Sequence, residues 1–407
     1  ERNNNYGSTY YSGEDFDDIV KRIQRKSEYL NDIKIFTSRL DYIKVYNKNT
    51  RVETGLKFSD VQSDSKNMFW NNTNNTWILD ANRSDRFSYS ENIYAAYTKI
   101  NCKFNALELS AGLRAEHTIF QTNSHTLNTT STKSYTELFP TLFLTHPIFN
   151  HDKIHLKYTR RIFRPEYRLM NPFEYYLNDY NLKRGNVNLH PSFSHNFELL
   201  YDLKGKFYFT FNYSIQDDEV GEFYIRKDDS NITINTYKNL ANSDLFTLSI
   251  SNSSTLFNWW SMDNDIYIGY NIYKDHDYSI ESAALDVSSN HNFLLGKNIK
   301  ANMGFHFSPK GSTYLYDTYS SNTYSMDLSI QKRFWDGKAD LGIYVNDILY
   351  RSGNFETKNN YKGQKIYSNI KKDTRRVGFY FKYRLGWGNK INVSKNEKSN
   401  GKELGRK

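Results

Sequence analysis

The sequence predicts an all-β fold of antiparallel, up-and-down strands, and three observations support this prediction. Apolar and polar residues alternate with a period of two through most of the 407-residue chain. Short and long connections between the alternating segments follow one another without exception. Aromatic residues make up 16% of the chain although its mean hydropathy is only −0.78. Such a composition indicates a sheet with one apolar and one polar face, because a disordered chain would contain few aromatic residues.

The alternation defines three parts of the chain. Residues 1–32 show no clear period and are expected to form an irregular segment, either a loop or a partial strand. Residues 33–387 carry the strands, and residues 388–407 form a polar, basic tail. No export signal precedes the first strand. We expect either that the mature chain begins at Glu1 or that further sequence lies upstream.

Each predicted strand has two chemically different faces. The alternation is clearest in residues 107–116, 207–215, 265–272, 340–346 and 377–385. Because successive strand side chains point to opposite faces, one face of each segment is apolar and the other carries charged and polar groups. Many segments reach the roughly 9–11 residues that cross a membrane. Strands of a soluble sandwich average only about 5–6 residues.

The connections favour a transmembrane barrel over a sandwich. Short ones are predicted near residues 47–49, 103–105, 149–152, 204–205, 256–258, 296–298 and 335–337. Long ones are predicted at residues 62–85, 122–132, 163–191, 218–241, 274–284, 310–321 and 351–372. Tight turns at one end and long loops at the other are typical of up-and-down membrane barrels, whereas Greek-key sandwiches mix the two lengths. The count gives about fifteen strands, and since bacterial single-chain barrels are even-numbered, at least one is missing at the front.

Four tryptophans are predicted to mark one rim of this barrel. They lie in or beside short turns, or end the last strand. Amphipathic rings favour the interface between lipid and water, so we expect an interface girdle there. Its members are Trp259, Trp260, Trp335 and Trp387.

One proline-rich stretch interrupts the regular pattern. Five of the six prolines lie between Pro140 and Pro191. Proline removes a donor from the sheet ladder, so this region cannot be plain central sheet. We predict a strand over residues 154–162, a long shaped loop and a strand over residues 193–203. The turn signals within the loop are Arg164-Pro165, Asn171-Pro172, Gly185-Asn186 and His190-Pro191.

This stretch also carries a family resemblance. The order R-P-x-Y-x-x-x-N-P-F, R-G-N-x-N-L-x-P and H-x-F-E-L-x-Y, beginning at Arg164, resembles the barrel domain of TonB-dependent receptors. It is most similar to the outer membrane beta-barrel family of Bacteroidetes-type bacteria. Four further stretches fit the same family, and the resemblance extends over roughly residues 35–400. They are AGLRAEHT, ELFPTLFLTH, WDGKADLGIYVNDI and RRVGFYFKYRLGWG.

The resemblance implies a function and a set of partners. It implies TonB-dependent uptake of a bulky nutrient, such as a siderophore or glycan, in the bacterial outer membrane. It also implies a 22-stranded barrel, of which about seven strands and the plug domain lie upstream of Glu1. The expected partners are outer-membrane lipid, the missing plug, TonB through that plug, and a nutrient whose identity the sequence leaves open. Because basic residues are scattered except in the tail, no nucleic-acid partner is expected.

The candidate site residues belong to the family-motif loop, where they are either architectural or in contact with ligand. Arg161 is expected on the polar face with His155, Lys157 and Thr159, opposite Arg160 and its neighbours. A lumen arginine could pair with plug carboxylates or an anionic nutrient, and tyrosines could stack on a sugar or chelate ring. The full set is Arg161, Arg164, Pro165, Tyr167, Asn171, Pro172, Tyr175, Tyr176, Gly185, Asn186 and Pro191.

Catalytic residues, metal ligands and cofactors are not predicted. The chain lacks the nucleophile-elbow, zinc-protease and phosphate-loop motifs. His151 and His155 are four apart on a strand, too far to share a metal, and a metal role for His190 and His195 is not favoured. Three alternatives remain open: a passive pore or structural barrel, a soluble all-β module that binds glycans, and a barrel enzyme.

Overall fold

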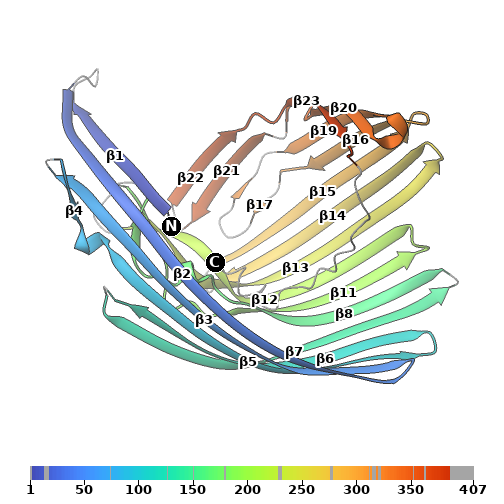
Figure 1. The fold of residues 1–407 in the computed structure, drawn as a ribbon, viewed down its shortest axis with the longest axis horizontal. Helices are drawn as coiled ribbons and strands as arrows, with labels where there is room; N and C mark the ends of the chain where they lie inside the picture. The colour runs from blue at the N-terminus through green and yellow to red at the C-terminus, as the bar shows by residue number, and fades with distance from the viewer. Residues whose placement is uncertain are drawn as a thin grey trace.

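The computed structural model contains one large antiparallel sheet and two small hairpins (Figure 1). It describes residues 2–12, 18–73, 75–125, 127–149, 151–177, 180–227, 232–275, 278–310, 312–313, 318–319, 322–351, 353–361 and 364–385. Trp387 and the predicted tail, residues 388–407, therefore lie outside the described residues. None of the described helical turns has the length or the apolar composition of a membrane span.

Sixteen strands of the large sheet pair in chain order and form its wall. They are β1 (Arg2–Ser12), β2 (Asp18–Asn47), β3 (Thr50–Thr73), β5 (Asp85–Phe104), β6 (Leu107–Ser124), β7 (Thr129–Phe149), β8 (Asp152–Phe163), β11 (Ser192–Leu203), β12 (Phe207–Arg226), β13 (Thr233–Phe257), β14 (Trp260–Asp275), β15 (Tyr278–Leu294), β16 (Ile299–Ser308), β19 (Thr323–Phe334), β20 (Ala339–Asn346) and β23 (Arg376–Tyr383). The prediction of an all-β, up-and-down antiparallel fold is confirmed.

The remaining elements are short. The three other strands of the large sheet are β4 (Thr76–Leu79), β9 (Glu174–Tyr176) and β10 (Asn181–Arg184). The two small hairpins are β17 (Ser312–Thr313) with β18 (Thr318–Tyr319), and β21 (Asn354–Tyr361) with β22 (Gln364–Lys371). Three 3-10 turns complete the fold: η1 (Ala81–Arg83), η2 (Tyr167–Leu169) and η3 (Trp335–Gly337).

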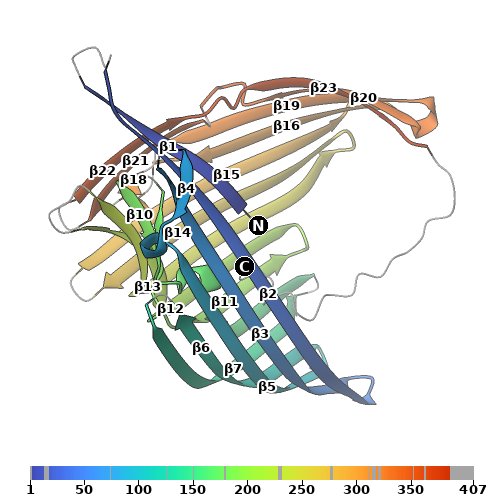
Figure 2. The ribbon, with the colours of Figure 1, turned by 60° about the vertical axis from the view of Figure 1, so that its left-hand side comes forward.

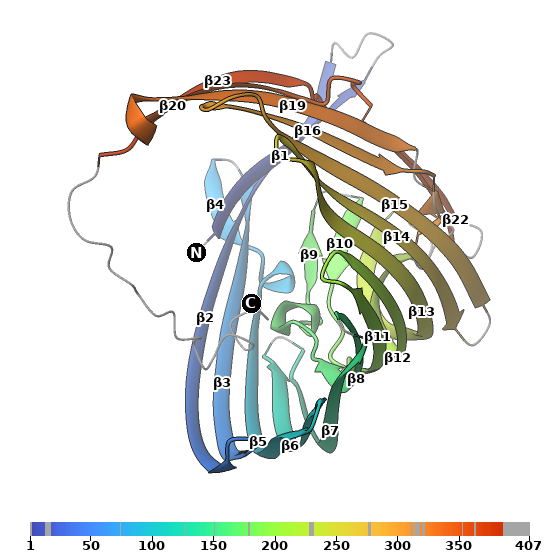
Figure 3. The ribbon, with the colours of Figure 1, turned by 90° about the vertical axis from the view of Figure 1, so that its right-hand side faces the viewer.

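The wall curls around an interior but does not close (Figures 2 and 3). Within the described residues, β1 pairs with β2 and β23 pairs with β20, and these two edge strands do not pair with each other. The N-terminal region differs from its expectation: most of residues 1–32 form β1 and the first part of β2. This addition raises the wall from about fifteen strands to sixteen. Sequence periodicity missed β1 because residues 2–12 are mostly polar at both odd and even positions of the sequence.

All seven predicted short connections occur where they were expected. The predicted long loops need correction, because several of them continue as paired strand. β3 extends to Thr73, and β12 and β13 remain paired as far as Arg226 and Thr233. Backbone pairing requires no apolar face once a hairpin rises into water, so polar composition does not end these strands.

Three glycines in the wall lie directly opposite tyrosines on neighbouring strands. The pairs are Gly55 with Tyr97, Gly342 with Tyr380, and Gly378 with Tyr344. A Cβ atom on Gly55 would lie 2.5 Å from the Tyr97 hydroxyl oxygen, so the ring occupies the space that a side chain would fill. Such aromatic cover compensates for the side chain that glycine lacks within a strand.

Candidate functional site

Residues 164–191, which we call the inner segment, leave the wall between β8 and β11 and fold into the interior (Figure 3). The segment contains η2, β9 and β10. β8 and β11 pair with each other from Phe163 and Ser192 onward, so the wall remains continuous beneath the segment. Pro165 and Pro191, at the two ends of the segment, are both buried. The prolines explain why the chain departs from the sheet here, because they cannot donate to its ladder.

The inner segment contributes three of the eight buried residues of the apolar core cluster. Tyr167, Met170 and Leu189 are 4%, 2% and 1% exposed. The wall residues in the same cluster come from both sides of the interior: Val61, Phe87, Tyr89, Phe120 and Tyr237. The rings of Tyr167 and Tyr89 have their centroids 4.7 Å apart. The hydrophobic effect therefore holds the segment against β3, β5 and β6 and against β13.

Arg164 ties the beginning of the inner segment to three strands of the wall. Its Nη2 atom donates to Oε2 of Glu116 on β6 at 2.7 Å, and its Nε atom donates to the hydroxyl of Tyr135 on β7 at 3.0 Å. Glu91 on β5 is also near, with its Oε1 atom 3.6 Å from Nε. Only 12% of the Arg164 side chain is exposed, against 9% for Glu116 and 1% for Glu91. One arginine thus faces two enclosed carboxylates.

The electrostatic surroundings keep Arg164 charged. Burial lowers the pKa of its guanidinium, but Tyr135, Glu116 and Glu91 raise that pKa further, so it lies above its ordinary value. A planar guanidinium can bond several acceptors at once, which suits arginine to this position.

Turn residues shape the middle of the inner segment. The side-chain oxygen of Asn171 accepts a hydrogen bond from the backbone N–H of Phe173 at 3.0 Å, an arrangement typical of an Asx turn. A Cβ atom on Gly185 would lie 2.3 Å from the Asn171 carbonyl oxygen, so only glycine fits there. The next residue, Asn186, donates its backbone N–H to the Leu169 carbonyl at 2.7 Å. These contacts close the segment upon itself.

The end of the inner segment is anchored to the opposite part of the wall. β10 pairs in parallel with the start of β13. Nδ2 of Asn186 donates to the carbonyl oxygen of Tyr237 at 2.9 Å. His190 and Asn239 exchange two hydrogen bonds: His190 N donates to Oδ1 at 3.1 Å, and Nδ2 donates to His190 O at 2.9 Å. The segment therefore bridges the interior.

The structure brings only part of the predicted set together. Pro165, Tyr167, Asn171, Gly185 and Asn186 join Arg164 in the inner segment, as do Pro172 and Pro191. Arg161 is exposed and lies opposite Ser194 on β11, away from the Arg164 cluster. The side chains of Tyr175 and Tyr176 lie outside the described part of the structure.

Arg160 points to the opposite face of the sheet from Arg161, and its side chain binds β7. The β7–β8 ladder ends at the pair Thr141–Thr159, next to Pro140, which cannot donate. Nη1 of Arg160 reaches across the end of this ladder and donates to the Leu138 carbonyl and to Oε2 of Glu137, both at 2.7 Å. An arginine fills the place where the two strands separate.

Sequence reasoning missed three partners of the inner segment. They are Glu91, Glu116 and Asn239. Glu116 belongs to the AGLRAEHT motif, and a carboxylate on the polar face of a strand was the available signal. Nothing in the sequence pairs it with an arginine 48 residues later.

The histidines do not converge. His195 bonds to the Tyr158 hydroxyl at 2.8 Å, whereas His190 bonds to Asn239. In the described ranges, no three His, Cys, Asp or Glu side chains form a group that could hold a metal ion.

The tryptophans at the short turns belong to aromatic clusters. Trp259 and Trp260 lie at the β13–β14 turn, with ring centroids 6.0 Å apart, and both contact Phe257 and Phe293. Trp335, in the β19–β20 turn, is 64% exposed and contacts Phe381 and Tyr383 edge-on.

The comparisons with known proteins agree with this architecture. A model of the outer membrane protein beta-barrel family matches residues 1–383. No curated protein sequence matches the chain. The family resemblance inferred from the motifs is thereby confirmed.

Several solved structures share the fold. The ferric yersiniabactin uptake receptor FyuA from Yersinia pestis is 11% identical, with a TM-score of 0.59, over 94% of this chain and 57% of its own. The copper transporter OprC is 12% identical, with a TM-score of 0.65, over 90% and 58%. The ferric citrate transporter FecA is 10% identical, with a TM-score of 0.58, over 92% and 56%. The chain thus spans somewhat more than half the length of these proteins.

Proposed function

Because the chain belongs to the outer membrane protein beta-barrel family, we propose that it forms the barrel of a receptor for TonB-dependent uptake of a bulky nutrient. The family and the structural neighbours indicate the bacterial outer membrane as its location. The apolar face of the wall then meets lipid, and the polar face lines the lumen. Trp259, Trp260 and Trp335, near the short turns, are assigned to a girdle at the membrane interface. Trp387, which lies outside the described residues, is assigned to the same girdle from the sequence alone.

The inner segment is the observation that carries this proposal. A passive pore needs a water-filled channel, whereas receptors fill the lumen with folded chain. Here buried apolar residues, the Arg164 ion pairs and the Asn186 and Asn239 hydrogen bonds hold the segment across the interior. This arrangement favours a gated receptor over an open pore.

The structural neighbours support a metal chelate as one nutrient class, because FyuA, OprC and FecA are named for ferric yersiniabactin, copper and ferric citrate. A glycan remains the second class. The exposed Arg161 is the residue of the family-motif loop that we assign to contact with ligand or plug carboxylates. Tyr175 and Tyr176 are assigned to ring stacking on the nutrient. The other motif residues, from Arg164 to Pro191, are assigned an architectural role.

The proposed mechanism needs parts that lie outside this chain. Outer loops capture the nutrient, the lumen face guides it, and a plug that TonB moves opens the path. We place that plug in additional sequence of the same protein, together with about six further strands that pair with the open edges of β1 and β23 and bring the sixteen wall strands to twenty-two.

Two measurements on the full-length protein test this function. Liposomes that contain it should not swell in raffinose, because the inner segment and plug fill the lumen. Cells that lack the gene should lose growth on one member of a panel of ferric chelates and oligosaccharides, and loss of TonB should reproduce that defect. Rapid swelling, or uptake that persists without TonB, would support the passive pore instead.

A further inference from the structure

The outward face of four neighbouring strands carries two hollows, one beyond the other along the strands. β2, β3, β5 and β6 pair in continuous register. Residues directly opposite each other therefore form rows across the four strands, and successive rows on one face are about 6.7 Å apart. The two hollows occupy different rows of this array.

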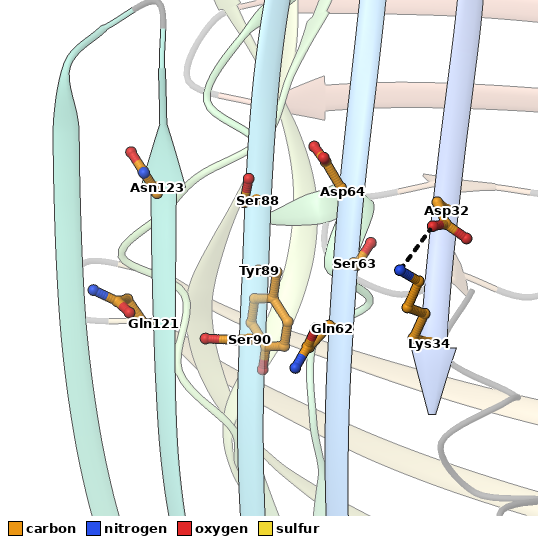
Figure 4. A pocket seen from close by; sticks show the side chains of 10 residues that line it. All are labelled: Asp32, Lys34, Gln62, Ser63, Asp64, Ser88, Tyr89, Ser90, Gln121 and Asn123. Carbon is orange, nitrogen blue, oxygen red and sulfur yellow. Dashed lines mark ion pairs between the residues drawn. The ribbon is translucent and has the colours of Figure 1, made fainter. Parts of the chain in front are cut away.

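The first hollow is polar and has a volume of about 380 Å³ (Figure 4). One of its rows consists of Lys34, Gln62, Ser90 and Gln121. Three of these four side chains are uncharged and offer hydroxyl or amide groups. They can donate and accept hydrogen bonds at the same time.

The next row of the polar hollow contains its two carboxylates. It consists of Asp32, Asp64, Ser88 and Asn123. Asp32 lies 3.8 Å from the Lys34 ammonium, and Asp64 lies 2.6 Å from the guanidinium of Arg86 (the first of these ion pairs is drawn in Figure 4). Each carboxylate therefore has a cation beside it, and Lys66 also acts electrostatically on Asp64.

The second hollow is an apolar groove of about 500 Å³ on the same four strands, nearer the short turns. The small side chains of Ala96, Thr98 and Ala115 lie between the larger Leu56 and Leu113, which are 58% and 46% exposed. A groove of this kind on the lipid-facing side of a membrane barrel has the shape and chemistry to hold an acyl chain.

An aromatic row separates the hollows. Phe58 and Tyr94 lie opposite each other with ring centroids 5.1 Å apart. Aromatic rings favour the interface between lipid and water, so this row marks the edge of the bilayer. The groove then lies within lipid and the polar hollow just outside it. The nearest rows of the two hollows are three rows, about 20 Å, apart.

We propose that these two hollows form one site for a membrane glycolipid, whose acyl chain lies in the groove and whose uncharged sugars occupy the polar hollow. The groove continues the lipid-facing surface, which supplies such molecules directly. The lining favours a polyhydroxyl headgroup over a phosphate, because six of its ten residues are serine, asparagine or glutamine, which offer uncharged hydroxyl or amide groups, and its two carboxylates would repel a phosphate. This inference needs only the location in the membrane and does not rest on the proposed transport function.

The test uses the full-length protein in phospholipid nanodiscs and two amphiphiles with the same eighteen-carbon chain, which is long enough to cross the three rows between the hollows. Octadecyl maltoside presents two uncharged sugars, and octadecyl phosphocholine presents a zwitterionic phosphate. Native mass spectrometry measures how much of each remains bound. The unchanged protein should retain the maltoside in preference to the phosphocholine.

Three variants locate the binding. Ser90→Trp fills the polar hollow, and Gln121→Ala removes hydrogen bonds there without adding bulk. Each should weaken maltoside retention by about tenfold, which the loss of one or two hydrogen bonds produces. Ser279→Trp, at an exposed position paired with Lys274 on the far part of the wall, is the matched control and should change nothing. Equal retention of both amphiphiles, or equal effects of Gln121→Ala and Ser279→Trp, would overturn the proposal.

Discussion

Replacing Arg164 with alanine tests what holds the inner segment in the lumen. The change removes the guanidinium that bonds Glu116 and Tyr135 and lies 3.6 Å from Glu91. Both carboxylates are at most 9% exposed. Glu116 keeps a second cation, Arg114, whose Nε atom lies 2.5 Å from its Oε1 atom, whereas Glu91 loses its ion pair with Arg164. Breaking a buried pair by removing one partner costs about 3–5 kcal/mol, because an uncompensated charge remains. We expect the inner segment to open more easily by that amount.

Hydrogen exchange measures this opening at a defined position. The Asn186 N–H bonds to the Leu169 carbonyl inside the segment, so its protection reports whether the segment keeps its folded structure. A loss of about 3 kcal/mol corresponds to exchange that is faster by more than about 100-fold. A combined variant, Arg164→Met with Glu91→Gln, should recover most of the protection, because Glu116 keeps its ion pair with Arg114 and the Glu91 charge is removed.

Arg161→Ala is the matched control, since this arginine is exposed and lies only three residues away. Surface substitutions of this kind change stability by less than about 0.5 kcal/mol. If Arg164→Ala and Arg161→Ala left the Asn186 amide equally protected, the ion pairs would not hold the segment, and the reasoning would be refuted.

Three further changes test packing at single positions. Gly185→Ala places a methyl group 2.3 Å from the Asn171 carbonyl and should cost about 1–3 kcal/mol of segment stability by hydrogen exchange; unchanged protection would mean that the close approach is absent. Tyr167→Ala should cost about 3–5 kcal/mol in the same assay, whereas Tyr167→Phe keeps the ring contact with Tyr89 and should cost little; equal losses would argue against a role for that ring contact. Tyr380→Ala uncovers Gly342 and should lower the unfolding free energy in urea by about 1 kcal/mol. A more stable variant would mean that the Tyr380 ring does not stabilise the strand at Gly342.

The turns were the most predictable part of the fold. Asn105, Lys204 and Gly205 adopt positive φ angles at short connections, and asparagine and glycine are common turn signals. The outer ends of the strands were less predictable. Ser63, Ser65 and Asn67 of β3 are buried although they look like loop residues, because their neighbours across the interior decide their burial.

The inner segment likewise has parts that the sequence predicts and parts that it does not. Its turns could be predicted, since the side-chain oxygens of Asn171 and Asn186 each accept a hydrogen bond from the backbone N–H two residues later. Its anchors could not, because the Arg164 partners come from strands that precede it by tens of residues. Arg160 illustrates the same limit. Alternation placed it opposite Arg161, but its bond to the Leu138 carbonyl depends on where the β7–β8 ladder ends.

Spin labels on β11 test most directly whether one face of the wall meets lipid and the other lines the lumen. Leu199, which is 41% exposed, should face lipid, and its neighbour Glu198, which bonds to Lys157, should face the lumen. With Cys102 replaced by serine, a label at each position of the full-length protein in lipid reports its access to oxygen and to a water-soluble nickel complex. We predict that the label at position 199 meets oxygen and the label at position 198 meets nickel. Equal access at both positions, or the reverse order, would contradict a barrel wall.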